Sequence, residues 1–295
     1  MISCRWDAHD AGETLLGTAP LARSWLVIEQ PGPWGRDAIV DGHLPADVAT
    51  HLAGAKGTGT TVLLARHAEH RPASSGRNVW AAYCAPGHSR LRHGVVADLE
   101  EVLNWDLSAI GQGGLPALDE EATAPLMLVC THSGRDRCCA VEGRSLSSAL
   151  MARLAPAERS RVWECSHIGG HRFAPVLLSL PLGVVHGRVS IEEALAIFTL
   201  APDGEVLLDR LRGRSSLSPV AQVAVAEVMR RYGISDIDSL KAMADGPLVR
   251  VRHGDGHSWT VDVESAPLPR DRQESCAKPA VPGHCLTCVA VEADY

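Results

Sequence analysis

The sequence of 295 residues has no apolar run long enough to cross a bilayer, and its first residues lack the basic start and apolar stretch of a signal peptide. It also has no surplus of basic residues, since the formal net charge is −7 and the pI is near 6.0. General nucleic-acid binding requires a basic surface, so that function class is disfavoured, as is an acidic partner. We therefore expect a cytoplasmic protein without a nucleic-acid or membrane partner.

The chain contains nine cysteines, an odd number, without a secretory signal. In a reducing compartment such cysteines serve as ligands, redox thiols or small buried apolar residues rather than as a disulfide framework. With 45% hydrophobic residues the chain is able to bury one large core or two modest ones, so it needs no metal merely to fold. A metal in this protein would therefore imply chemistry.

Apolar runs and helical segments follow one order, strand, helix, three strands, helix, and the order occurs twice. The first set of elements is expected at residues 25–30, 45–55, 61–67, 79–85, 91–96 and 98–107. After a polar, glycine-rich link, the second set is expected at 126–131, 144–154, 162–167, 176–181, 184–189 and 191–199. The sequence thus predicts an α/β (α+β) protein with two similarly built halves packed together.

The last third of the chain has its own signals. Ser218 and Pro219 predict the start of a helix that ends at Gly233. A hairpin is predicted over residues 248–264. The stretch from about residue 266 is rich in proline, and we expect it to be irregular.

Two pairs of metal-binding residue types stand at the ends of predicted strands. Cys130 closes the apolar run LMLVC, and a polar loop leads to Cys139 at the start of a helix, whose dipole stabilises a thiolate. His167 follows another strand, and two glycines in the loop after it precede His171. Two thiolates and two imidazoles complete a site for one zinc ion or for the two irons of a [2Fe–2S] cluster, so ligand type alone does not choose between them.

A family resemblance is carried by the strings CTHSGRDRCC and SHIGGHRFAPVLLSLPLGVVHGR, together with WLVIEQPGPWGRD and ESCAKP. These strings are similar to those of the sucrase/ferredoxin-like family, and the similarity covers nearly the whole chain. It implies a thioredoxin-like ferredoxin domain and a [2Fe–2S] centre outside the Rieske fold, bound by cysteines spaced C-x8-C and histidines spaced H-x3-H. By that spacing the implied ligands are Cys130, Cys139, His167 and His171. Cys138 competes for the second cysteine role, although the spacing favours Cys139.

Three regions are predicted from these observations. Residues 1–120 form an amino-terminal α/β half whose role is unknown. Residues 121–200 form the thioredoxin-like ferredoxin domain with the cluster ligands. Residues 201–295 form an extension of helix, hairpin and irregular chain that contains cysteines.

The implied cofactor predicts an electron carrier that exchanges electrons with a redox partner protein, rather than an enzyme. Neutral imidazoles in place of two thiolates make the site less negative, so its reduction potential is expected above that of an all-cysteine ferredoxin. An imidazole bound through one nitrogen keeps a proton on the other, which predicts proton-coupled electron transfer. The residues give no support to sucrose hydrolysis, because no pair of carboxylates is set for it.

Two alternatives from other classes stay open at this point. A thioredoxin-like thiol oxidoreductase would use Cys138 and Cys139, or the C-x-x-C pair Cys285 and Cys288. A zinc-stabilised interaction module would use the same four ligands as the cluster. Colour distinguishes these alternatives from an iron–sulfur protein, since both would be colourless.

The remaining candidates have plainer interpretations. Together with Cys276 and His284, the C-x-x-C pair has the residue types of a second metal site, but it lacks a strand-to-helix context. A lone cysteine such as Cys4 is interpreted as a buried apolar residue. The residues expected to hold the ligand loops or to bond to sulfur are His132, Arg135, Asp136 and Arg172. A short basic cluster, interpreted as a solvated loop or as a docking surface for an acidic redox partner, contains Arg210, Arg212 and Arg214.

Overall fold

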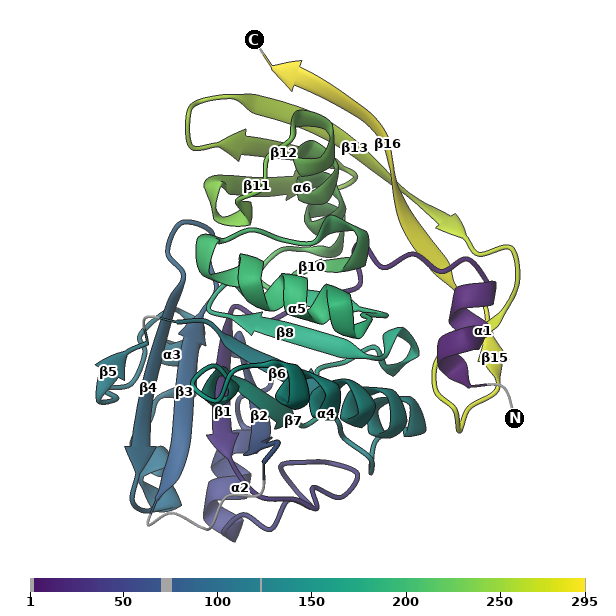
Figure 1. Cartoon of the computed structure of the whole chain (residues 1–295). Coiled ribbons are helices and arrows are strands. Elements are labelled where there is room, and N and C mark those ends of the chain that lie inside the picture. The colour runs from purple at the N-terminus through teal and green to yellow at the C-terminus, as the bar shows by residue number, and fades with distance from the viewer. Residues whose placement is uncertain (1–2, 70–75, 123, 295) are drawn as a thin grey trace.

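The computed structural model describes residues 3–69, 76–122 and 124–294. Its main feature is a mixed ten-stranded sheet with the order β10-β9-β8-β6-β7-β2-β1-β3-β4-β5 (Figure 1). The first half of the chain supplies β1 (Ser24–Glu29), α2 (Ala46–Ala53), β2 (Thr60–His67), β3 (Arg77–Tyr83), β4 (Arg90–Val96), the 3₁₀ helix η1 (Leu99–Asn104), α3 (Leu107–Gly111) and β5 (Glu120–Glu121). In this half β1 is parallel to β2 and antiparallel to β3, and β3 is antiparallel to β4.

The second half repeats this topology. Its elements are β6 (Leu126–Cys130), the π-helical turn η2 (Cys139–Gly143), α4 (Arg144–Arg153), η3 (Arg159–Arg161), β7 (Val162–Cys165), η4 (His171–Phe173), β8 (Val176–Leu180), β9 (Val184–Gly187), α5 (Ile191–Leu200), η5 (Ala201–Asp203), η6 (Leu208–Arg210) and β10 (Leu211–Arg214). β6 is parallel to β7 and antiparallel to β8, and β8 is antiparallel to β9. The halves join where β2 pairs with β7. The predicted α/β (α+β) class is confirmed.

Apolar side chains on both faces of the sheet explain its strand patterns. Leu26 and Ile28 pack against the helices of the first half, α2 and α3, whereas Trp25 and Val27 face a core that both halves share. In the second half α4 and α5 cover the face that bears Val129. Because both faces are covered, the strands have nearly continuous apolar runs.

One predicted helix differs from the structure. The helix expected at 98–107 is divided into η1 and α3, because Asp106 accepts hydrogen bonds from the backbone nitrogens of Ser108 and Ala109 and so begins a new helix. Asp98 caps η1 in a capping box with Glu101. Two acidic caps within one short segment therefore produce two short helices.

The extension contains α6 (Pro219–Tyr232), η7 (Ile237–Ser239), β11 (Leu240–Asp245), β12 (Leu248–His253), β13 (Ser258–Pro267), β14 (Arg272–Gln273), β15 (Ala280–Val281) and β16 (His284–Asp294). As predicted, Ser218 caps α6 and Gly233 ends it with a φ of 68°. The expectation of irregular chain after residue 266 holds for 268–283, which has only two two-residue strands, but was wrong for β16, which pairs with β13 along its whole length. A register shift leaves Val289 as an extra, exposed residue, which breaks the alternation that would have revealed the strand.

The amino-terminal helix α1 (Cys4–Asp10) lies next to β14 and β15 (Figure 1). Asp7 of α1 accepts a hydrogen bond from Arg270 at 2.9 Å. Glu13 is buried and bonds to Arg172 at 2.8 Å and to Arg272 at 3.0 Å. These contacts join α1 and the segment around β14 to the loop that contains His171.

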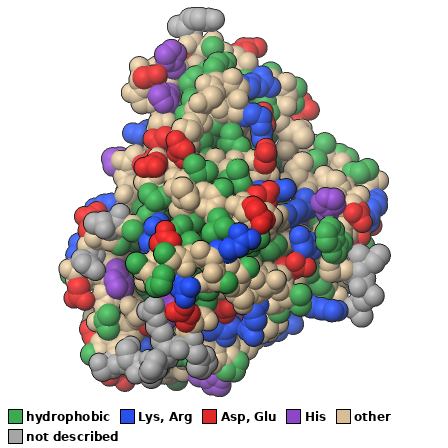
Figure 2. Space-filling model, in the orientation of Figure 1, with side chains coloured by type: hydrophobic (Ala, Val, Ile, Leu, Met, Phe, Trp, Pro, Cys, Tyr) green, Lys and Arg blue, Asp and Glu red, His purple; other side chains and the backbone are tan. Residues whose placement is uncertain are grey.

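The surface drawn in Figure 2 has acidic and basic side chains interspersed over much of its area. This pattern fits the near balance of 28 Lys and Arg with 35 Asp and Glu. Within the described residues, no helix has the length and apolar character that a membrane span requires.

Candidate metal centres

The four implied ligands lie on two neighbouring loops at one edge of the sheet. Cys130 ends β6 and Cys139 begins η2, whereas His167 follows β7 and His171 begins η4. β6 and β7 are parallel neighbours, with Cys130 opposite Cys165. Chains that leave parallel strands in this way emerge at the same edge, so these four residues, which we name the Cys2His2 site, are brought together.

Distances within the Cys2His2 site are short. Nδ1 of His167 lies 3.8 Å from Sγ of Cys130 and 3.9 Å from Sγ of Cys139. The ligand atoms of these three residues are all within 4.8 Å of one another. The ring of His171 lies beside the ring of His167: the two ring centroids are 5.2 Å apart, and the ring planes are inclined by 32°. The four side chains therefore lie around one small volume.

Burial at this site leaves polar atoms without partners. Both cysteines are 1% exposed, and both ring nitrogens of His171 are buried without a hydrogen-bond partner among the described residues. A buried polar group that stays unpaired costs about 1–3 kcal/mol. Coordination of a metal by His171 would remove that cost, so the donor set fits a bound metal group.

The carboxylate of Asp136 lies close to the ring of His171. Its Oδ2 lies 3.6 Å from Nε2 of the ring, which leaves Nδ1 as the nitrogen available to a metal. Burial lowers the pKa of His171, although the charge of Asp136 opposes this effect. The ring is therefore neutral at pH 7, the form that binds metals.

The two thiols of the site differ in their ionisation. A hydrogen bond from Cys139 holds the pKa of Cys130 well below its usual value, against the effect of burial. The same hydrogen bond, together with burial, raises the pKa of Cys139 well above its usual value. Of the two thiols, Cys130 is therefore the one that ionises more readily.

A buried arginine holds the histidine loop. Arg212 is 2% exposed, and it donates to the carbonyl of Gly169 at 2.8 Å and to Oγ1 of Thr18 at 3.0 Å. Burial lowers its pKa to about 9. Arg214 is 1% exposed and pairs with Asp238 at 2.7 Å. The interpretation of this basic cluster as a solvated or docking loop was therefore wrong for Arg212 and Arg214, because the sequence shows their charge but not their partners.

The other polar residues near the ligands have structural contacts. Nε2 of His132 lies 2.9 Å from the carbonyl oxygen of Gly35. Arg172 donates to Glu13 at 2.8 Å, whereas Arg135 is exposed. Of the four residues predicted to hold or tune the site, Asp136 has the closest relation to a proposed ligand.

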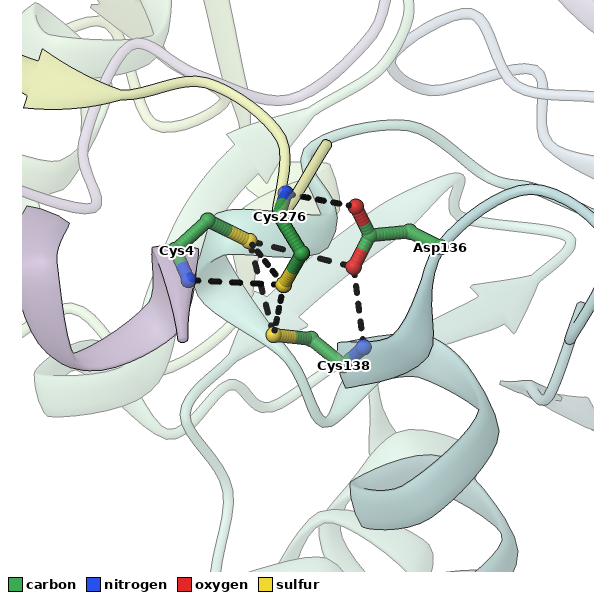
Figure 3. Close-up of side chains that lie close together, drawn as sticks. All are labelled: Cys4, Asp136, Cys138 and Cys276. Atoms are coloured by element: carbon green, nitrogen blue, oxygen red, sulfur yellow. Dashed lines mark hydrogen bonds between the residues drawn. The ribbon is translucent and has the colours of Figure 1, made fainter. Parts of the chain in front are cut away.

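Figure 3 shows a second group of ligand-type side chains. It adjoins the first, because Asp136 lies 3.6 Å from His171. It consists of Cys4, Asp136, Cys138 and Cys276, and we name it the Cys3Asp site. Sγ of Cys138 lies 3.4 Å from that of Cys4 and 3.3 Å from that of Cys276. The structure thus directs Cys139, not Cys138, towards His167. A hydrogen bond from Cys4 lowers the pKa of Cys138 to about 6, against burial.

Sequence analysis did not associate these four residues with one another. Cys4 was interpreted as a buried apolar residue, and Cys276 was associated with the C-x-x-C pair. Instead Cys285 and Cys288 lie on β16, where each sulfur contacts a backbone carbonyl. Among the described residues, neither belongs to a group of three or more potential ligands. Cys4 and Cys276 are 272 residues apart, and local spacing carries no signal over that distance.

Comparison with known proteins gives one family and one distant relative. The model of the sucrase/ferredoxin-like family matches residues 15–213, more than half of the chain. Altered inheritance of mitochondria protein 32 from Meyerozyma guilliermondii is 29% identical over 111 residues, which are 35% of this chain and 39% of that protein. The match therefore spans well under half of the relative's length. No solved structure matches the chain.

Proposed function

The chain belongs to the sucrase/ferredoxin-like family, and on that premise we propose that the Cys2His2 site holds a [2Fe–2S] cluster and that the protein carries electrons to or from a redox partner. The observation that supports this most is the convergence of two buried thiols and two imidazoles from separate loops. Such a cluster, when bound, takes up and releases one electron.

Each residue of the site has a distinct part in this proposal. Cys130 and Cys139 bind as thiolates from the β6 loop, and the two imidazoles bind as neutral rings from the β7 loop. The carboxylate of Asp136 lies 3.6 Å from Nε2 of His171 and so favours binding of a metal through Nδ1. Arg212 holds the backbone between the two histidines through Gly169.

Proton coupling is part of the same proposal. A ligating imidazole keeps a proton on its second nitrogen, and the basicity of that nitrogen depends on the charge at the metal. Both His167 and His171 are half-buried. The potential is therefore expected to fall as pH rises, which voltammetry from about pH 6 to 10 measures.

The test is metal analysis and spectroscopy of the full chain purified without air. We expect about two irons per chain, a red-brown colour that dithionite bleaches, and a paramagnetic resonance signal after reduction. In His171→Cys the signal should persist with altered g-values, because a thiolate replaces an imidazole. Cys285→Ser is the matched control and should leave the signal unchanged.

Two results would overturn the proposal. One is a colourless protein with zinc at the Cys2His2 site, the outcome expected of an interaction module. The other is a signal that His167→Cys and His171→Cys both leave unaltered. A thiol oxidoreductase that uses Cys138 and Cys139 is not favoured, because the two sulfurs are directed to different sites.

A further inference from the structure

We propose that the Cys3Asp site binds one zinc ion, which joins α1 and the segment between β14 and β15 to the loop that contains Cys139. This inference goes beyond electron transfer and does not rest on it, since the Cys3Asp site shares no residue with the Cys2His2 site. The two sites are therefore testable separately.

The three sulfurs form a nearly equilateral triangle. Their separations are 3.4 Å for Cys4 and Cys138, 3.3 Å for Cys138 and Cys276, and 3.5 Å for Cys276 and Cys4. Sulfurs bound to one tetrahedral zinc at about 2.3 Å are roughly 3.8 Å apart, so binding requires an outward shift of only a few tenths of an ångström. All three thiols are free, and a disulfide would need a separation near 2.05 Å.

Asp136 supplies the fourth ligand atom. Its Oδ1 lies 3.8 Å from Sγ of Cys4, and its side chain is 1% exposed. The carboxylate is held in place by the backbone nitrogens of Cys138 at 2.8 Å and Cys276 at 3.1 Å, and by Oγ of Ser275 at 2.9 Å. Placing one carboxylate beside three thiols concentrates acidic groups in a buried volume, which a divalent cation compensates.

The donor set selects the metal. Three soft thiolates and one carboxylate favour zinc over calcium or magnesium, which prefer oxygen ligands. The ligand atoms all lie within 4.8 Å of one another, which fits a single ion. A surface hollow lined in part by Trp6, Val141 and Cys138 adjoins the site and provides an entry path.

The ligands come from three separate parts of the chain (Figure 3). Cys4 begins α1, Asp136 and Cys138 lie just before η2, and Cys276 lies between β14 and β15. Ion pairs such as Arg272 with Glu13 already hold these segments together. A shared ion would close two long loops of chain, so zinc binding and the docking of α1 and the β14–β15 segment should stabilise each other.

The first experiment measures zinc and iron in the full chain after anaerobic purification. The wild type should contain about one zinc, and Cys276→Ser should lower the zinc content about tenfold or more while iron stays. Cys276 is half-buried in a loop, so this substitution spares the core; Cys288→Ser is the matched control and should keep both metals. Cys130→Ser should lose iron and keep zinc.

Three outcomes would overturn the proposal. They are a wild type with zinc below about a tenth of an equivalent, a Cys276→Ser variant that keeps its zinc, and a Cys130→Ser variant that loses zinc together with iron. In the last case the zinc would have been bound at the Cys2His2 site. Failure of the electron-carrier proposal alone would appear differently, as absent iron with zinc unaffected by Cys130→Ser.

The second experiment uses Co²⁺ as a coloured probe in the double variant Cys130→Ser, Cys139→Ser, whose Cys2His2 site has no thiol. A thiolate-to-cobalt charge-transfer band with strong tetrahedral d–d absorption should appear, and adding Cys276→Ser should abolish it, whereas adding Cys288→Ser should not. A pale octahedral spectrum would contradict the proposal. So would a disulfide between Cys4 and Cys138 in the anaerobic wild type, found by mass spectrometry.

Discussion

The two halves of the ten-stranded sheet have the same strand order and directions, yet different residues stand at their matching strand ends. When the strands are matched by their pairing and by the face that helices cover, Glu29 of β1 corresponds to Cys130 of β6. In the same way His67 at the end of β2 corresponds to His167 after β7. The two halves therefore share one topology but differ in side-chain chemistry at these strand ends.

In the first half these positions are used for internal contacts. Glu29 accepts hydrogen bonds from the backbone nitrogen and the side-chain amide of Asn78, at 3.0 and 2.6 Å. Nε2 of His67 lies 3.2 Å from the carbonyl oxygen of Arg159, and its ring packs edge-on against Trp163. The fold thus brings two strand ends together in each half, and residue type decides whether a metal site can form there.

The largest effect is expected from a substitution at a position where the two halves differ in side-chain chemistry. Cys130→Ser should remove nearly all bound iron, because a serine hydroxyl is a poor substitute for a thiolate. Glu29→Gln, at the corresponding position of the first half, should leave the iron content unchanged. Iron analysis and the absorption spectrum measure both variants. Equal iron loss in the two would mean that the first half also takes part in binding the cluster.

A second prediction concerns the backbone of the histidine loop. Gly170 has a φ of +73°, and a Cβ there would lie 2.5 Å from Nη2 of Arg212. Gly170→Ala should therefore cost about 3 kcal/mol of unfolding free energy, from strain plus displacement of that buried guanidinium. Gly57 of the first half has a φ of +86° with nothing within 4 Å, so Gly57→Ala should cost only about 1 kcal/mol. Urea titration gives both values, and equal costs would contradict a role for the Arg212 contact.

A third comparison is between histidines on β9 and β4. Burial lowers the pKa of His186 to about 3, and both its ring nitrogens lack a hydrogen-bond partner among the described residues. Below about pH 6.5 this histidine takes up a proton in the unfolded chain but not in the folded chain. The free energy of unfolding therefore falls on acidification from pH 6.5 towards pH 3, by up to about 1.4 kcal/mol per pH unit. His186→Leu should reduce that slope. His93→Leu is the control, because His93 is bonded to Asn78 at 2.9 Å; an unchanged slope in His186→Leu would refute the prediction.

The comparison also shows what the sequence was able to predict. Strand and helix order followed from local periodicity, and the four residues of the Cys2His2 site could be proposed as a group because each pair lies within one loop. The Cys3Asp site was missed because its ligands come together only through tertiary packing, over separations of 132 to 272 residues. The burial of Arg212 and the pairing of β16 were missed for related reasons: one depends on distant carbonyls, and the other on a bulge at Val289.

The smallest expected effect tests the link between the two metal sites. Asp136 faces Cys4 through Oδ1 and His171 through Oδ2. Asp136→Asn removes a negative charge beside a proposed ligand, which favours the added electron, so the reduction potential should rise, on the order of 60 mV for a tenfold change in the one-electron equilibrium.

This measurement requires chelator-treated protein, both wild type and variant, so that loss of zinc does not contribute to the shift. Asp106→Asn, which changes an exposed helix cap in the first half, is the matched control and should leave the potential where it was. A redox titration followed by paramagnetic resonance gives the values. If Asp136→Asn leaves the potential unchanged, the carboxylate holds the loops through its bonds to Cys138 and Ser275 but exerts no field on His171, and the two sites would be neighbours without electrostatic coupling.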